Sequence, residues 1–405
     1  MNVFYKMYCR TFQAVLKQLI KLMPWRKPEL LRFENGAAGL AGFIKGKGLN
    51  SVLVVTDGNL MKLGLCTPML EALEKEGVKA TVYDKVVANP TIDNVEEALK
   101  MYRDGGAQGI IAFGGGSPMD CAKGVGARVA RPGKPIPKMK GILKVGKKMP
   151  PFFAIPTTSG TGSETTLAAV ITDTTNPEHH LKYAIQDFPL IPHYAVLDPS
   201  LTAGLPQKVT STTGMDALCH AVEAYIGNSN TKETKAKAEE AVKLIFKYLK
   251  RAYDNGGDME ARENMQTAAF DAGVAFTRAY VGNVHAMGHA MGAKYNTPHG
   301  LAMAVILPHM LDFYGEKIYK KLAKLADAAG ISGKDDEEKA KAFIRAVKDM
   351  NAYMNIPENF GGIIKKEDVP EMCEAAYKEA NPLYPVPVMM GREDFAKMYL
   401  EVLNG

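Results

Sequence analysis

The stretch GIIAFGGGSPMDCAKG (109–124) joins a run of apolar residues to a helical segment through three consecutive glycines. Glycine lacks a Cβ, so a ligand can approach this turn closely, and the free N–H groups of the following helix favour an anion such as a pyrophosphate. The spacing fits neither GxGxxG nor a Walker A loop. The stretch predicts a buried strand that ends at a nucleotide-binding turn, although such a turn can also join a strand to a helix without any ligand.

Strand and helix patterns alternate on both sides of this stretch, from about residue 31 to residue 200. Short apolar runs predict strands, and longer runs with helical periodicity separate them. The expected strands are 51–55, 80–87, 109–113, 151–156 and 193–198, and the expected helices are 59–77, 92–105 and 117–130. This alternation is typical of an α/β domain with a parallel sheet, a Rossmann-like arrangement suited to dinucleotide binding.

The chain after Pro206 shows helical periodicity without strand patterns. Helices are expected near 208–229, 231–253, 258–281, 302–327, 336–352, 366–379 and 392–403. We therefore expect an α/β domain followed by an all-helical domain. The expected division is 1–28 as a basic amphipathic helix, 29–205 as a dinucleotide-binding domain and 206–405 as a metal-binding domain.

A second polar turn, IPTTSGTGSE (155–164), follows another expected strand. Its hydroxyl groups could bind ribose, phosphate or a nicotinamide carboxamide, although alone it could be a simple Ser/Thr-rich loop. Two such turns at the carboxyl ends of strands together favour a nucleotide. Asp57 follows the strand 51–55, where a carboxylate accepts from an adenosine ribose and repels a 2′-phosphate, which favours NAD over NADP. It could equally cap the helix that follows.

Histidines are concentrated in the helical half of the chain. The segments GMDALCHAVEAY (214–225) and NVHAMGHAMGAKYNTPHG (283–300) supply the candidate metal ligands, which are Asp216, His220, His285, His289 and His299. Two pairs stand four residues apart, so each pair shares one helical face. Imidazole and carboxylate groups in this number indicate a divalent metal and suit Fe²⁺ or Zn²⁺. Glu223 lies on the same face as the first pair and is a competing oxygen ligand.

Four motifs, GGGSPMDCAK, PTTSGTGSE, GMDALCHAVEAY and HAMGHAMGAKYNTPHG, resemble in this order the iron-containing alcohol dehydrogenase family. The resemblance covers about residues 30–400. It implies that the metal ligands are Asp216, His220, His285 and His299, and that His289 lies on the substrate and nicotinamide side. It also implies cofactor contacts from Asp57, Asn89, Gly115, Gly116, Ser117, Thr157, Thr158, Thr161 and Lys182. The implied cofactors are NAD and Fe²⁺, with Zn²⁺ as an alternative.

The resemblance implies an oxidoreductase that transfers a hydride between NAD(H) and a small alcohol or aldehyde, with His289 as general acid or base. Three alternatives differ from this function. They are a metal- and NAD-dependent carbocycle-forming lyase of the dehydroquinate synthase type, an enzyme of the glycerol dehydrogenase type, and a non-catalytic assembly protein that retains the fold. The methionine-rich surroundings of the histidines disfavour the first, and four intact ligand positions disfavour the last.

The composition excludes several other classes of protein. The net charge of +6 arises before Glu29, where six basic residues and no acidic residue occur, so a basic footprint for nucleic acid is not supported. Five scattered cysteines without a CxxC pair argue against a disulfide framework and fit a reducing compartment. No stretch approaches the roughly 18 apolar residues of a membrane span. We expect a cytoplasmic enzyme.

The first 28 residues are the part of the chain for which the resemblance implies no role. Apolar side chains recur at helical spacing over 4–22, basic residues lie beside them, and two prolines follow. An exposed stripe of this size needs a cover, which could be its own domain, a sister subunit or anionic lipid. We expect protein packing and a homodimer or larger homo-oligomer, and do not favour membrane contact.

Overall fold

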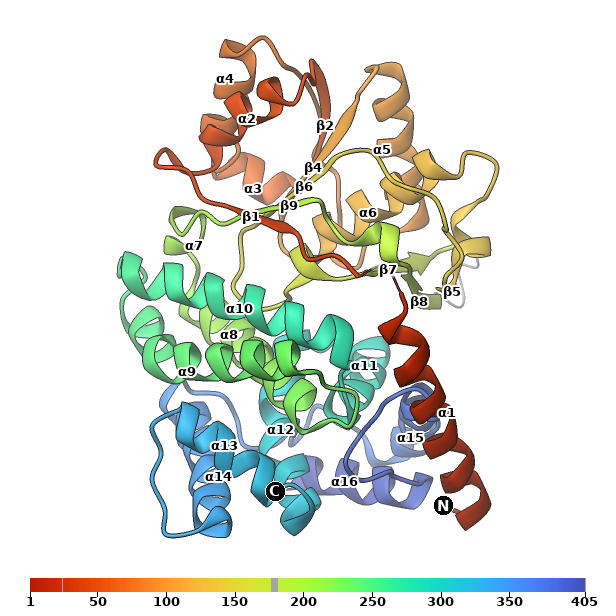
Figure 1. Ribbon diagram of the computed structural model, residues 1–405, viewed down its shortest axis with the longest axis vertical. Helices are drawn as coiled ribbons and strands as arrows, with labels where there is room; N and C mark the ends of the chain where they lie inside the picture. The colour runs from red at the N-terminus through yellow and green to blue at the C-terminus, as the bar shows by residue number, and fades with distance from the viewer. Residues whose placement is uncertain (24, 176–180, 405) are drawn as a thin grey trace. The chain divides into compact units, whose positions relative to one another are not determined.

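The computed structural model describes residues 1–23, 25–175 and 181–404 (Figure 1). The chain forms two compact units, of which one is Pro24–Gly204 and the other combines Met1–Met23 with Leu205–Gly405. The first unit is α/β with a parallel sheet and the second is helical, which confirms the predicted fold class. The expected division of functions at residues 28 and 205 stays a prediction.

The α/β unit is built on a six-stranded parallel sheet with the order β1-β9-β6-β4-β2-β3. Its strands are β1 (Glu29–Leu31), β2 (Ser51–Val55), β3 (Lys79–Tyr83), β4 (Gly109–Gly114), β6 (Phe152–Pro156) and β9 (Tyr194–Val196). All five expected strands are present in it. The additional strand, β1, has only three residues, which are too few to show a period in the sequence.

Helices cover both faces of this sheet (Figure 1). The helices of the unit are α2 (Leu40–Gly46), α3 (Gly58–Lys62), α4 (Thr67–Lys75), α5 (Ile92–Asp104), α6 (Gly116–Ala130) and α7 (Ser200–Ala203). Alternate residues of β2 point to opposite faces: Val52 and Val54 join the apolar cluster of α2 and α4, whereas Leu53 and Val55 join that of α5 and α6. Burial on both faces explains the continuous apolar run of each central strand.

The α/β unit departs from the sequence-based expectation in further places. The helices α2 and α7 are additional to the expected helices. The expected helix 59–77 is two helices, α3 and α4, and between them Gly64 adopts a positive φ of 70°. A small second sheet, with the order β5-β8-β7, was not expected. Its strands are β5 (Gly141–Ile142), β7 (Ala168–Asp173) and β8 (Leu181–Gln186), and β7 pairs with β8 in antiparallel orientation. Their apolar alternation is too short to predict strands.

The helical unit is arranged around a buried helix, α8. Its helices are α1 (Val3–Lys21), α8 (Gln207–Ile226), α9 (Lys232–Asp254), α10 (Met259–Ala279), α11 (Asn283–Tyr295), α12 (His299–Tyr314), α13 (Tyr319–Ala328), α14 (Asp336–Tyr353), α15 (Val369–Ala380) and α16 (Arg392–Asn404). Every residue from Gly214 to Ile226 is buried, because α9, α10 and α12 pack around α8. Polar groups on this part of α8 therefore lie inside the unit.

Two features of the helical unit differ from expectation. The segment 302–327 is divided between α12 and α13, and Gly315 between them has a φ of 50°. The helix α11 is additional to the expected helices, although its histidines were singled out. Short 3-10 turns in the two units occupy Gly36–Gly39, Ile136–Met139, Ser163–Thr165, Phe188–Leu190, Gly315–Lys317 and Lys366–Asp368. Among the described residues, no helix is long and apolar enough to cross a membrane.

Candidate active site

Two polar turns of the α/β unit begin side by side. Gly114 and Pro156, the last residues of β4 and β6, are register partners in neighbouring strands. The Thr157 backbone N–H donates to the Gly114 carbonyl at 3.2 Å, and a Cβ on Gly115 would lie 3.6 Å from the Thr158 side chain. The glycine turn and the hydroxyl turn predicted from the sequence thus form one polar surface at the carboxyl edge of the sheet, where α/β folds bind ligands.

The helix α6 begins at this surface. Gly115 is its N-cap and offers no side-chain cap, and a Cβ on Gly116 would lie 3.5 Å from the Thr161 side chain. The hydroxyl oxygens of Thr158 and Ser159 are buried and accept or donate no hydrogen bond within the described part of the chain. Uncapped helical N–H groups and orphaned hydroxyls fit a ligand that carries phosphate and ribose oxygens.

Three further candidate cofactor residues are joined by hydrogen bonds. The Asn89 backbone N–H donates to Ser117 Oγ at 3.2 Å, and Lys182 Nζ donates to Asn89 Oδ1 at 2.7 Å. Asn89 adopts a positive φ of 58°, a conformation that asparagine tolerates better than most residues. The structure therefore brings together residues from the loop after β3, the start of α6 and the strand β8.

Asp57 follows β2, which neighbours β4 in the sheet. Its Oδ1 accepts hydrogen bonds from the backbone N–H groups of Asn59 and Leu60 at 2.9 and 3.1 Å, so it caps α3. The structure thus contains the helix-capping interaction that the sequence left open for Asp57. It does not exclude the ribose interpretation, because both capping bonds use the same oxygen and a carboxylate has two.

Lys123 was not among the functional residues expected from the sequence, although a lysine within an apolar helical stretch can indicate a buried ammonium group. It is fully buried on α6, and its ammonium group donates to the backbone oxygens of Ser163, Thr166 and Ala168 at 2.7, 3.0 and 2.9 Å. Burial lowers the pKa of Lys123 to about 8, and the nearby Asp120 carboxyl opposes this effect. The ammonium group ties the segment after the hydroxyl turn to α6.

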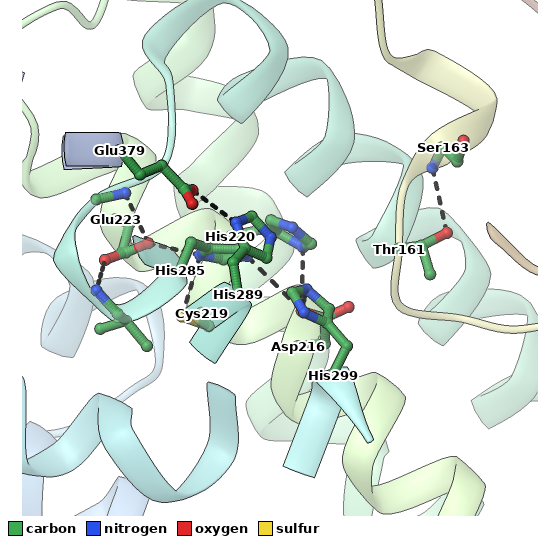
Figure 2. A network of polar contacts seen from close by, with 12 residues as sticks. Thr161, Ser163, Asp216, Cys219, His220, Glu223, His285, His289, His299 and Glu379 are labelled. Carbon is green, nitrogen blue, oxygen red and sulfur yellow. Dashed lines mark hydrogen bonds and ion pairs between the residues drawn. The ribbon is translucent and has the colours of Figure 1, made fainter. Parts of the chain in front are cut away.

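Four side chains of the helical unit converge on one point (Figure 2). Asp216 and His220 lie one turn apart on α8, His285 is the third residue of α11, and His299 is the first residue of α12. One ligand atom of each lies within 4.8 Å of the others. Asp216 Oδ1 is 3.7, 3.9 and 3.4 Å from a ring nitrogen of these three histidines in the same order. These separations are longer than ordinary hydrogen bonds and suit donors around a common ion.

The electrostatics of this cluster fit a cation. Burial raises the pKa of Asp216 to about 8, although His289 opposes the shift. Burial and the neighbouring His220 and His299 hold the pKa of His285 well below its usual value, so this imidazole is neutral and can act as a ligand. Asp216 Oδ1 and His285 Nε2 make no hydrogen bond to the described residues. A divalent ion would satisfy both buried atoms.

Glu223 orients His285. Its Oε2 lies 2.6 Å from His285 Nδ1, and its two oxygens accept from the backbone N–H groups of Gly282 and Val284 at 2.8 Å each. With Nδ1 directed at the carboxylate, Nε2 is directed at the cluster, as in a carboxylate–histidine–metal arrangement. Three N–H partners therefore favour an orienting role for Glu223 over the direct ligation that the sequence left open.

The ring of His220 is positioned by stacking. It lies 4.0 Å from the Phe276 ring, centroid to centroid, at an angle of 12°, and 4.5 Å from the His285 ring. Nearby Cys219 has its Sγ 3.8 Å from His285 Nδ1. Burial raises the pKa of the Cys219 thiol well above its usual value, so this side chain is a neutral thiol.

His289 lies one turn after His285 on α11 but in a different environment. Its side chain is 42% exposed, against 2% for His285. Its Nδ1 lies 2.6 Å from Glu379 Oε1, which also accepts from the Tyr384 hydroxyl at 2.7 Å, and its ring stacks on the His299 ring at 5.2 Å (Figure 2). The sequence analysis missed Glu379 and Tyr384, because no spacing relates them to a histidine that lies about 90 residues away.

Comparison with known proteins places both units in one family. The family model described as iron-containing alcohol dehydrogenase matches residues 28–199, and the C-terminal model of the same family matches residues 210–403. Alcohol dehydrogenase 4 of Schizosaccharomyces pombe is 39% identical over 364 residues, which cover 88% of this chain and 85% of that protein.

Two solved structures show the same similarity. The structure of a 1,3-propanediol oxidoreductase has a TM-score of 0.89 and 33% identity, and the match covers 94% of this chain and 99% of that one. A sulfoacetaldehyde reductase from Bifidobacterium kashiwanohense, solved in complex with NAD⁺, has a TM-score of 0.83 and 26% identity, with coverage of 94% and 99%.

Gly300 allows α12 to approach α8 beside His299. A Cβ at this position would lie 2.3 Å from the Thr212 carbonyl oxygen, a backbone atom that cannot rotate away. We expect Gly300→Ala to displace His299 and to weaken the binding of Co²⁺ or Zn²⁺ by about tenfold or more, the usual effect of disturbing a ligand's support. Titration of metal-depleted protein measures the affinity.

The control for this substitution is Gly292→Ala on α11. A Cβ there would lie 3.7 Å from the Thr297 carbonyl oxygen, which is an ordinary contact, so the metal affinity is expected to stay unchanged. Equal affinities for Gly300→Ala and the unsubstituted protein would show that this close approach does not position His299.

Proposed function

The chain belongs to the iron-containing alcohol dehydrogenase family, and we propose that it transfers a hydride between NAD(H) and a small alcohol or aldehyde. The observation that carries this proposal is the cluster of one carboxylate and three imidazoles, three of them buried, in which one ligand atom of each residue lies within 4.8 Å of the others. A catalytic metal site needs three or four protein ligands and room for the substrate.

We assign the metal to Asp216, His220, His285 and His299. A divalent ion bound there supplies a Lewis acid that polarises the substrate oxygen. Fe²⁺ is the ion that the family name indicates, and Zn²⁺ suits the same donors. The protein's contribution is a rigid and largely buried ligand set, in which Glu223 orients His285 and Phe276 stacks on His220.

We assign the cofactor to the polar edge of the six-stranded sheet and propose that it is NAD. The sulfoacetaldehyde reductase solved with NAD⁺ supports this choice. The contacts would come from Asp57, Asn89, Gly115, Gly116, Ser117, Thr157, Thr158, Thr161 and Lys182. In this set, the uncapped start of α6 suits the pyrophosphate and the hydroxyl groups suit the ribose and carboxamide.

We assign proton transfer to His289. Its Nδ1 is held by Glu379, so Nε2 is the nitrogen that accepts a proton during alcohol oxidation and donates one during aldehyde reduction. The Tyr384 hydroxyl donates to the same oxygen of Glu379 and fixes the carboxylate. The half-exposed imidazole can exchange this proton with solvent.

The experiment that tests the function compares two histidines on one helix. We expect His285→Ala to lose both the bound metal and the oxidation of small alcohols with NAD⁺. His289→Ala is expected to keep about one ion per chain while turnover falls by about 10² or more, because a general acid–base group is removed. Metal analysis and NADH absorbance are the measurements. Full activity after complete removal of the metal by a chelator would reject the proposal.

The cofactor choice is tested at Asp57. Asparagine keeps the cap of α3 but removes the charge, so Asp57→Asn is expected to raise kcat/KM for NADP⁺ relative to NAD⁺ by about tenfold without loss of helix. Asp57→Ser, which also retains a capping oxygen, is the second variant. A preference of the unsubstituted enzyme for NADP⁺ would show that Asp57 does not discriminate between the two cofactors.

The role of Glu379 is tested by a pair of substitutions. We expect Glu379→Ala to lower kcat by about tenfold or more, with little change in KM or metal content, because the imidazole of His289 loses its orienting partner. Glu379→Gln retains an acceptor oxygen and is expected to recover most of the turnover. If Glu379→Ala turns over as fast as the unsubstituted enzyme, or if it loses metal, this positioning role is wrong.

A further inference from the structure

The helix α1 contacts its own unit through Cys9, which is buried in the apolar core, through Tyr5, which packs against that core, and through three polar side chains. Gln13 is buried, Arg10 and Lys17 are partly buried, and all three donate to backbone carbonyl groups at 2.6–3.1 Å. The carbonyl groups belong to Pro382, Tyr384, Val386, Pro387 and Asn228. These contacts fix the rotation of α1 about its axis.

The opposite side of α1 exposes apolar side chains to solvent. Phe4 is 80% exposed and Leu22, which follows the helix, is 84% exposed. The exposed members of this side are Val3, Phe4, Met7, Tyr8, Val15, Leu19 and Leu22, which we call the α1 apolar face. They are seven of the sixteen large apolar side chains exposed in the described chain, so they form a patch rather than a random scatter. The described residues of the protein's own unit do not cover this face, so of the protein packing that the sequence predicts only packing on a sister subunit would cover it.

The charges beside the α1 apolar face are positive. Arg10 and Lys17, which we call the basic flank, are partly buried at the edge of the side that faces the unit, where they donate to carbonyl oxygens, and among the described residues neither forms an ion pair with a carboxylate. Lys321 on α13 lies close to Lys17, because the ammonium groups of both side chains donate to Asn228. Burial chiefly, and then repulsion from Lys235, Lys17 and Arg10, lowers the pKa of Lys321 to about 8. Residues 1–28 contain six basic residues and no acidic one.

This combination distinguishes between the possible partners. A second copy of α1 would bring the same positive charges against this flank, so pairing of two α1 helices is opposed by repulsion. A bilayer with anionic lipid offers both an apolar layer for the exposed side chains and negative headgroups for the basic flank. Helices of this kind lie in the plane of the interface and do not span it.

We propose that the α1 apolar face, together with its basic flank, is a docking surface for an anionic lipid bilayer. The protein binds through α1 lying along the surface, with Phe4 and Leu22 entering the boundary between headgroups and acyl chains. The binding is reversible, and it weakens at high salt because the electrostatic part is screened. This inference does not depend on the proposed catalytic function.

The test is co-sedimentation of the full chain with vesicles of phosphatidylcholine alone or mixed with phosphatidylglycerol. We expect binding to the mixed vesicles at low salt, release at high salt, and no binding to phosphatidylcholine alone. The combined substitutions Phe4→Ser and Leu22→Ser are expected to weaken binding by about tenfold or more, because they remove the most exposed apolar contacts. The control, Leu63→Ser, changes a side chain that is 70% exposed on α3 of the other unit and is expected to bind normally.

Two outcomes would overturn the proposal. One is the absence of sedimentation with mixed vesicles at low salt. The other is vesicle binding that the double variant leaves unchanged while light scattering shows that this variant forms a smaller assembly, in which case a second copy covers the face. The double variant is expected to retain alcohol oxidation, since neither residue touches the candidate active site. Loss of vesicle binding is thereby distinguished from failure of the proposed function.

Discussion

The buried carboxylate of Asp216 is the constraint on which the helical unit depends. A charge in this position is unfavourable unless a cation and several donors surround it, and the raised pKa of Asp216 expresses that cost. Three helices meet the requirement together: α8 carries the carboxylate, while α11 and α12 bring imidazoles to it. Gly300 contributes to this arrangement, because only a glycine allows the start of α12 to lie so close to the α8 backbone.

The α/β unit is built to hold polar groups at one edge of an apolar sheet. The parallel register of β4 and β6 starts the glycine turn and the hydroxyl turn at paired residues. Lys123 then ties the segment after the hydroxyl turn to α6 from inside the core. Preorganised turns of this kind suit a cofactor, because little ordering remains to be done when it binds.

Some functional groups of this site could be recognised without the fold and others could not. Asp216 and His220 are separated by one helical turn, so their pairing follows from local geometry. Glu379 reaches His289 only because α15 packs against α11. No sequence pattern near either residue predicts this contact. Periodicity indicates an apolar stripe on α1, but it cannot say that most of this stripe would face solvent while Cys9 and Gln13 face the protein.

The sequence by itself determined the α/β-then-helical order, the central strands, the family and the types of ligand available for a metal and a nucleotide. These properties depend on local periodicity and on motifs of a few residues, which the chain carries in any fold. The tertiary structure decided which atoms meet: the convergence of the four ligands, the orienting contact of Glu223, the Glu379–His289 pair and the outward apolar face of α1. Such contacts join residues that are distant in the chain, so only the packing of helices and strands against one another determines them.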